Sequence, residues 1–207
     1  MKLAVFDVDS TLLDAETIEF LAKEIGIEDK VKDITTRAMQ GELDFFESLI
    51  YRVKLLQGLS IKKVDEICQN LPLMKGAKET IKELKKNDFK VICLSGGFKN
   101  ATIPLKDKLN LDAEFSNILH QQDGYLTGLV GGEMMFNDSK SHVLSKIQSL
   151  LGISEDDTYA IGDGANDLGM FKHAKYKISF CAKPILEKEA NIIIKEKDLT
   201  KILDNIF

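Results

Sequence analysis

Short apolar segments that each end in an acidic or glycine-rich turn are the feature that most constrains the fold of this chain. Three of them stand out: Lys2–Val8, Phe89–Leu94 and Thr158–Ile161. Each is apolar enough to form a strand that is buried on both faces, which is typical of the centre of a parallel sheet. Shorter segments of the same kind cover Tyr176–Phe180 and Asn191–Ile194. Together these segments predict one sheet at the centre of the molecule.

Amphipathic helical patterns separate the strands, at about Ala77–Asn87, Lys99–Leu109, Lys140–Leu151 and Asp167–His173. Strands that alternate with helices predict an α/β fold, here a Rossmann-like parallel sheet with helices on both faces. Asp-Gly and Gly-Gly turn signals within Ile118–Phe136 predict additional short antiparallel strands. In parallel sheets ligands bind beyond the carboxyl ends of the strands, so we expect the turns after the three main strands to meet at one site.

One stretch interrupts this alternation, because the pattern from about Ala15 to Leu71 is helical throughout. A segment with so many helices is too long to be a simple crossover between two strands. We therefore interpret residues 15–71 as an inserted helical cap, and residues 1–14 and 72–207 as the α/β core.

Charge and apolar content exclude several classes of partner. The 207-residue chain has a net charge of -5, whereas binding to nucleic acid needs a strong basic excess, so we expect no nucleic-acid partner. The apolar run before Asp7 is too short for a secretion signal and no other run could span a bilayer, which predicts no membrane partner and a cytoplasmic location. Cys68, Cys93 and Cys181 lie far apart in apolar runs, which predicts reduced core residues.

Two acidic residues, Asp7 and Asp9, end the first strand. Side chains two positions apart on a strand end point to the same side. An ionised carboxylate can act as a nucleophile, but a phosphate dianion would repel it unless a cation offset both charges. Mg²⁺ suits that task because it prefers oxygen ligands and binds carboxylates together with phosphate. Taken alone, the pair is equally compatible with an acidic surface turn.

Two further turns and one lysine are candidates for the same site. The run GDGAND at 162–167 combines glycines, which allow close approach of the backbone to a ligand, with Asp163, a further carboxylate for a metal. Ser95-Gly96-Gly97 offers a hydroxyl and free N–H groups to phosphate oxygens. Taken singly, these are also compatible with a capped helix start and a common turn, and Lys140 with a solvated surface charge.

The order of these features, an acidic pair, Ser-Gly, a lysine and then Gly-Asp-Gly-x-x-Asp, resembles the haloacid dehalogenase-like phosphatases over nearly the whole chain. Within that superfamily, DVDSTL, LSGGF, GDGANDLGMF, the cap stretch MQGELDFFESLIYRVKLL and the later DGYLTGLV are similar to the phosphoserine phosphatases. The resemblance implies a magnesium-dependent phosphoric monoester hydrolase with a small-molecule substrate. Its expected reaction converts O-phospho-L-serine to L-serine and phosphate, the last step of serine biosynthesis, through a phospho-aspartyl intermediate.

The resemblance also implies roles for the acidic residues. Asp7 is expected to be the nucleophile, and Asp9 the general acid that protonates the leaving serine oxygen and then the base that activates water. Mg²⁺ is expected to bind the side chains of Asp7 and Asp163 and the backbone carbonyl of Asp9. Asp167 is expected close by, in contact through water or hydrogen bonds.

Other residues are expected to bind the substrate. By the resemblance, Ser95, the backbone N–H of Gly96 and Lys140 hold the phosphoryl oxygens, and Asn166 contacts the substrate side of the site.

The cap residues are expected to set specificity. Free phosphoserine carries an ammonium and a carboxylate, which Glu16 and Arg52 match in charge and in family position. Phe45 is expected either to shield the site from water or to be a core aromatic. Because the first strand begins next to Met1, we expect no N-terminal regulatory domain and no feedback by serine through one.

Two alternatives share the chemistry of Asp7. One is a phosphotransferase that passes the phosphoryl group from phosphoserine to another alcohol such as homoserine, and the other is a phosphatase for another small phosphate monoester. A third alternative, from a different class, is a signalling module whose aspartate stores phosphate. Such a module has no need of an acid like Asp9 or of an enclosing cap.

Overall fold

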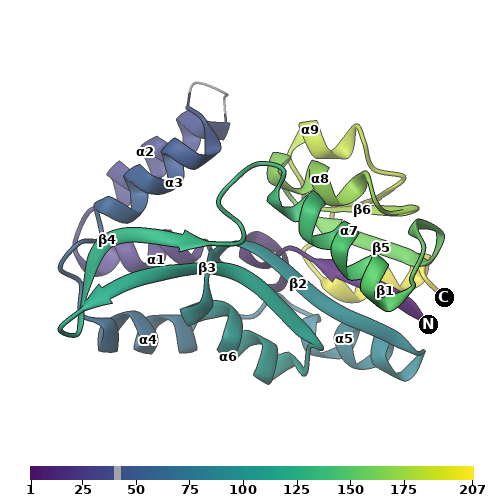
Figure 1. The fold of residues 1–207 in the computed structure, drawn as a ribbon. Helices are drawn as coiled ribbons and strands as arrows, with labels where there is room; N and C mark the ends of the chain where they lie inside the picture. Colours follow the sequence, from purple (N-terminus) through teal and green to yellow (C-terminus); the bar gives the residue numbers. More distant parts are fainter. Residues whose placement is uncertain (40–42) are drawn as a thin grey trace.

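A computed structural model describes residues 1–39 and 43–207. Its described part contains a seven-stranded sheet in the order β4-β3-β2-β1-β5-β6-β7 (Figure 1). The strands are β1 (Lys2–Phe6), β2 (Phe89–Phe98), β3 (Ala113–Gln122), β4 (Tyr125–Gly132), β5 (Thr158–Gly162), β6 (Tyr176–Phe180) and β7 (Ile192–Ile194). All neighbours are parallel except β3 and β4. The predicted parallel core is confirmed.

Helices cover both faces of the sheet (Figure 1). They are α1 (Thr17–Glu24), α2 (Glu28–Met39), α3 (Phe45–Lys54), α4 (Ile61–Gln69), α5 (Ala77–Lys86), α6 (Lys99–Leu109), α7 (Ser139–Leu151), α8 (Leu168–Phe171) and α9 (Pro184–Glu187). In β1, Ala4 and Phe6 belong to the core on the α5 and α6 face, whereas Leu3 and Val5 belong to the core under α7 and α8. This burial on both faces explains the continuous apolar run of β1.

β3 differs from the expectation of short antiparallel strands. It does pair in antiparallel fashion with β4, but it begins earlier, at Ala113, and its first half pairs in parallel with β2. The sequence pattern did not predict a strand in this half because several of its residues are polar. Glu114 Oε2 accepts hydrogen bonds from Thr102 Oγ1 (2.6 Å) and Ser116 Oγ (2.9 Å), and Lys99 forms an ion pair with Glu114. The strand is therefore stabilised by hydrogen bonds between buried polar groups as well as by apolar packing.

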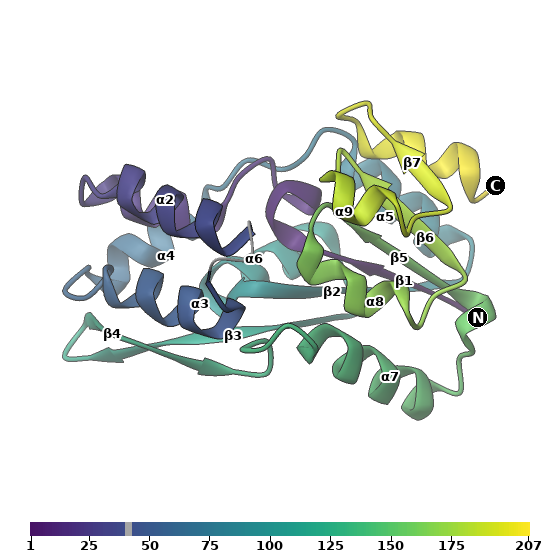
Figure 2. The same cartoon turned by 90° about the horizontal axis from the view of Figure 1, so that it is seen from above.

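Helices α1–α3 lie over one end of the sheet, beside the β3–β4 hairpin (Figures 1 and 2). The loop between α3 and α4 is hydrogen-bonded to this hairpin, with Gly58 N–H donating to Leu126 O (2.9 Å) and Leu126 N–H to Leu59 O (2.9 Å). The hairpin therefore supports the helices that follow β1. Of the stretch predicted to be helical, 40–42 lie outside the described residues.

The cysteines partly follow the expectation. Cys68 and Cys93 are buried free thiols, but the prediction of a core position is wrong for Cys181, which is exposed. Cys181 lies in the turn that follows β6 and has a left-handed φ of 46°. Its side chain leaves the core because the buried run of β6 ends at Phe180. Among the residues that the structure describes, no helix has both the length and the apolar character needed to cross a membrane.

Candidate active site

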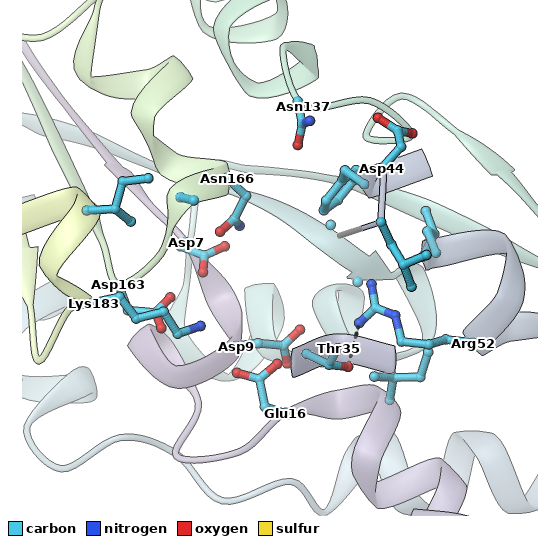
Figure 3. A pocket seen from close by; sticks show the side chains of 18 of the residues that line it. Asp7, Asp9, Glu16, Thr35, Asp44, Arg52, Asn137, Asp163, Asn166 and Lys183 are labelled. Carbon is cyan, nitrogen blue, oxygen red and sulfur yellow. Dashed lines mark hydrogen bonds between the residues drawn. The ribbon is translucent and has the colours of Figure 1, made fainter. Parts of the chain in front are cut away.

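A cavity of about 880 Å³ lies where the turns after β1 and β5 meet the last residues of β2, facing α1–α3 (Figure 3). The predicted turn Ser95-Gly96-Gly97 belongs to β2 itself, which continues to Phe98 instead of ending at Leu94. Seven of the predicted site residues line the cavity: Asp7, Asp9, Glu16, Arg52, Gly96, Asp163 and Asn166. The other three, Ser95, Lys140 and Asp167, are buried behind its wall. The expectation that these turns converge at one site is therefore met in the structure.

The turn after β1 presents both of its aspartates to the cavity. The Asp7 N–H donates to Ile161 O (2.9 Å), which fixes the end of β1 against β5. The chain then reverses through Ser10, whose φ of 58° is left-handed, and Leu13 N–H donates to Val8 O (2.9 Å). This tight reversal directs the Asp7 and Asp9 carboxylates into the same cavity (Figure 3).

Lys140 contacts the buried carboxylate of Asp7. It lies in the first turn of α7, and its Nζ donates to Asp7 Oδ1 (2.5 Å) and to Asp167 Oδ1 (2.6 Å). Only 4% of Lys140 is exposed, and Asp7 and Asp167 are buried as well. Buried charges of this kind need partners, so the lysine and the two carboxylates stabilise each other.

Three carboxylates come together beside Lys140. Oxygen atoms of Asp7, Asp163 and Asp167 lie within 4.8 Å of one another. Asp167 Oδ2 also accepts hydrogen bonds from the N–H groups of Asp163 and Gly164 (3.0 Å each), which orients its side chain. Burial, reinforced by the charge of Asp167, raises the pKa of Asp7 well above its usual range and the pKa of Asp163 to about 7.

This group fits a divalent cation. One ammonium faces three carboxylates, so negative charge is in excess in a buried place, and the raised pKa values of Asp7 and Asp163 reflect it. All the donors are oxygen atoms, which Mg²⁺ prefers. The Asp9 side chain is not a member of this group.

Asp9 is held by the start of α1. Its Oδ1 accepts hydrogen bonds from the Thr17 N–H (2.9 Å) and the Thr17 hydroxyl (2.5 Å). Burial, reinforced by the nearby charge of Glu16, raises the pKa of Asp9 to about 7. The carboxyl group is thus oriented and holds a proton more readily than an ordinary aspartate, as a general acid must. The sequence reasoning did not single out Thr17, although a threonine at a helix start is a recognisable capping residue.

The glycines after Ser95 allow three groups to approach closely. A Cβ atom on Gly97 would lie 3.0 Å from Ser95 Oγ and 3.1 Å from Asp9 Oδ2, and one on Gly96 would lie 3.2 Å from the ring of Phe45. The Gly97 N–H donates to Ser95 Oγ (2.9 Å), which orients the hydroxyl. Phe45 itself lines the cavity.

Glu16 and Arg52 face the cavity from the helices that follow β1 (Figure 3). Glu16 Oε1 accepts a hydrogen bond from Ser10 Oγ (2.6 Å). Arg52 donates from Nε to Ser48 O (3.2 Å) and from a terminal nitrogen to Thr35 Oγ1 (3.3 Å), so its guanidinium is oriented by α3 and α2. The site thus has one carboxylate and one guanidinium on the side of the helices that follow β1.

The sequence reasoning missed Lys183, which lines the cavity together with Pro184 and Ile185. Lys183 follows β6, just as Asp7 and Asp9 follow β1 and Asp163 follows β5. The rule that turns at the carboxyl ends of strands converge could therefore have found it.

Gly162→Ala is expected to destabilise the protein by about 2 kcal/mol or more, because the Cβ of the new alanine would displace the Asp167 side chain. The added Cβ would lie 2.3 Å from Asp167 Oδ2, and hydrogen bonds to two backbone N–H groups and Lys140 hold that carboxylate in place. Urea unfolding measures the change. Gly131→Ala, where an added Cβ meets nothing within 4 Å, is the matched control. Equal stability of the two variants would contradict this account of Asp167.

Comparison with known proteins defines the class. The family model of haloacid dehalogenase-like hydrolases matches residues 1–175. The chain is 58% identical over 206 residues to a phosphoserine phosphatase of Wolinella succinogenes, covering 100% of both chains. Together with the acidic cavity at the carboxyl ends of the strands, this shows that the chain belongs to the haloacid dehalogenase-like hydrolase family.

Solved structures agree over almost the whole length. A phospho-aspartyl intermediate analogue of phosphoserine phosphatase has a TM-score of 0.95 and 49% identity, with 99% of this chain and 98% of that chain covered. A substrate-bound phosphoserine phosphatase complex also has a TM-score of 0.95, with 48% identity and coverage of 99% and 97%.

Proposed function

We propose that this protein hydrolyses O-phospho-L-serine to L-serine and phosphate, the last step of serine biosynthesis. The observation that carries the proposal is one cavity with two different ends. Asp7, bonded to Lys140, and the three-carboxylate group lie at the core end, and Glu16 and Arg52 face the cavity from the helices that follow β1. The first end matches a phosphate ester, and the second matches the ammonium and carboxylate of an amino acid. The names of the similar proteins support the same substrate.

The metal that this site fits is Mg²⁺. The side chains of Asp7 and Asp163 and the backbone carbonyl of Asp9 would hold it, and Asp167 would contact it through water or hydrogen bonds. When bound, Mg²⁺ offsets the negative charges of the carboxylates and of the phosphoryl group, so that one anion can approach another.

In the first chemical step, an Asp7 carboxylate oxygen attacks phosphorus and the bond from phosphorus to the serine oxygen breaks. Asp9 gives its proton to that oxygen, which leaves as the serine hydroxyl. In the second step, the ionised Asp9 takes a proton from a water molecule, whose oxygen attacks phosphorus and releases phosphate from Asp7. The raised pKa of Asp9 supports both roles, because the group changes protonation state near neutral pH.

Lys140 orients the nucleophile and stabilises the charge that develops on the phosphoryl group. Its hydrogen bonds to Asp7 and Asp167 hold the ammonium beside the nucleophile that receives the phosphoryl group. Ser95, the Gly96 N–H and Asn166 complete the binding of those oxygens. Such transfer depends mainly on position and on neutralised charge.

Glu16 accepts hydrogen bonds from the ammonium of the substrate. Arg52 donates two parallel hydrogen bonds to the carboxylate of the substrate. We infer that residues 15–71 act as a cap that opens to admit the substrate and closes over it, with Phe45 excluding water. The Gly96–Phe45 approach supports this, because it brings the cap against the phosphate-binding turn. A cytoplasmic location is inferred as well, and the free thiols of Cys68 and Cys93 support it.

The proposal is tested by phosphate release from L-phosphoserine beside a panel of other phosphate monoesters, with Mg²⁺ and with EDTA. We expect preferred hydrolysis of phosphoserine that disappears when the metal is removed, because the repulsion at Asp7 is then no longer offset. Activity on other esters alone would keep the chemistry of Asp7 but reject the substrate. Formation of phosphohomoserine when homoserine is added would identify a phosphotransferase instead.

A further inference from the structure

Lys183 is a charged residue of the cavity that the proposed reaction does not use. It follows β6 and precedes α9, and its backbone is fixed at both ends. Its N–H donates to Asp163 O (2.8 Å), and its carbonyl accepts from the N–H of Leu186 (3.0 Å). Figure 3 shows its side chain extending past Asp163 into the cavity. The side chain of Lys183 thus starts from a backbone that is hydrogen-bonded to the turn that carries Asp163.

The charges that line the cavity are unequal. Acidic side chains come from Asp7, Asp9, Glu16, Asp44 and Asp163. Among the lining residues that the structure describes, the cations are Arg52 and Lys183.

These two cations lie on opposite sides. Arg52 belongs to α3, in the helices that follow β1, whereas Lys183 belongs to the sheet core. A substrate with both a phosphate and a carboxylate carries two anionic groups that need separate partners. Arg52 matches the carboxylate, whereas Lys183 lies beside Asp163, at the phosphate end of the cavity.

We propose that Lys183 binds the phosphate group of the substrate from the core side and, by its charge, weakens the affinity of the neighbouring acidic group for divalent cations. This proposal rests on the proposed function. It adds a phosphate-binding residue to the cavity wall. It also adds a positive charge beside the carboxylates of the metal site.

Electrostatic contact with Asp163 supports the second part. The Lys183 N–H donates to Asp163 O (2.8 Å), and the Lys183 side chain passes beside Asp163 in Figure 3. A positive charge placed there repels a cation bound to the Asp163 carboxylate.

The test uses Lys183→Met, which removes the charge and keeps most of the side-chain length, and Lys183→Arg, which keeps the charge. The control is Lys188→Met, because Lys188 is exposed on the same segment and does not line the cavity. Isothermal titration measures Mg²⁺ binding to each protein without phosphate, and then inorganic phosphate binding at saturating Mg²⁺. Neither measurement needs turnover, so a failure of the phosphoserine proposal would not affect the result.

For Lys183→Met we expect inorganic phosphate to bind about tenfold more weakly, the loss expected for one charged hydrogen bond. We expect Mg²⁺ to bind about threefold more tightly, because a repulsive charge has gone. Lys183→Arg and Lys188→Met should resemble the wild type in both. Unchanged phosphate affinity in Lys183→Met would overturn the proposal. Weaker binding of both ligands would also overturn it, because it would indicate a merely structural role.

Discussion

Asp7→Asn is expected to lower kcat on phosphoserine by about 10⁴-fold or more, because an amide cannot act as the nucleophile toward phosphorus. Asparagine has nearly the same shape as aspartate, and Lys140 would keep its hydrogen bond to Asp167. The loss should therefore appear in turnover and not in folding. Phosphate release under single-turnover conditions measures the chemical step directly.

Stability provides the control for this variant. Burial and the charge of Asp167 disfavour the ionised form of Asp7, as its raised pKa indicates. Asp7→Asn should thus keep or raise the Tm in metal-free buffer, since a buried charge has been removed. Asp123→Asn, in the exposed hairpin turn, should leave both activity and Tm unchanged. Substantial residual turnover in Asp7→Asn would rule out the covalent mechanism.

Arg52→Ala is expected to lower kcat/KM for phosphoserine by about 50-fold, but that for a simple aryl phosphate by only about twofold. The guanidinium lines the cavity at the end away from Lys140, where only an amino-acid substrate presents a carboxylate. An aryl phosphate has no such group and loses little. Steady-state kinetics on both substrates give the ratio.

Two further variants separate binding from support of the fold. Lys54→Ala, on the exposed side of α3, should leave both substrates unaffected. Arg52→Lys keeps the charge but loses the forked geometry, so it should recover only part of the phosphoserine activity. Equal losses on the two substrates in Arg52→Ala would mean that its bonds to Ser48 and Thr35 matter for structure and not for specificity.

The parallel sheet was predictable because most of its strands can be recognised from a few neighbouring residues. β1 and β5 are short, continuously apolar and followed by turns, and the bounds of β6 and α6 agree with the structure to the residue. β3 was predictable only in part, since Glu114 and Ser116 are polar and are stabilised by partners on α6. A pattern based on apolar residues cannot detect a strand that is buried through paired polar groups.

Lys140 and Lys183 show the corresponding limit for the site. The residues around Lys140 do not separate it from a surface lysine, yet Lys140 is almost completely buried between two carboxylates. Its contact with Asp7 joins residues 133 positions apart. Only the packing of α7 against the sheet makes them neighbours. Lys183 reaches the cavity through the turn after β6, which hydrogen-bonds to the Asp163 turn.

The sequence by itself determined the class of fold and the turns where chemistry takes place, because strand burial and turn residues act over a few neighbouring positions. It also supplied the family, through the order of four short motifs. The tertiary structure decided which charges meet: the three carboxylates around Lys140, the Thr17 contact that orients Asp9, and the distance between the Asp7 and Arg52 ends of one cavity. These depend on long-range packing, since electrostatic interactions are set by separation in space and by burial and not by position along the chain.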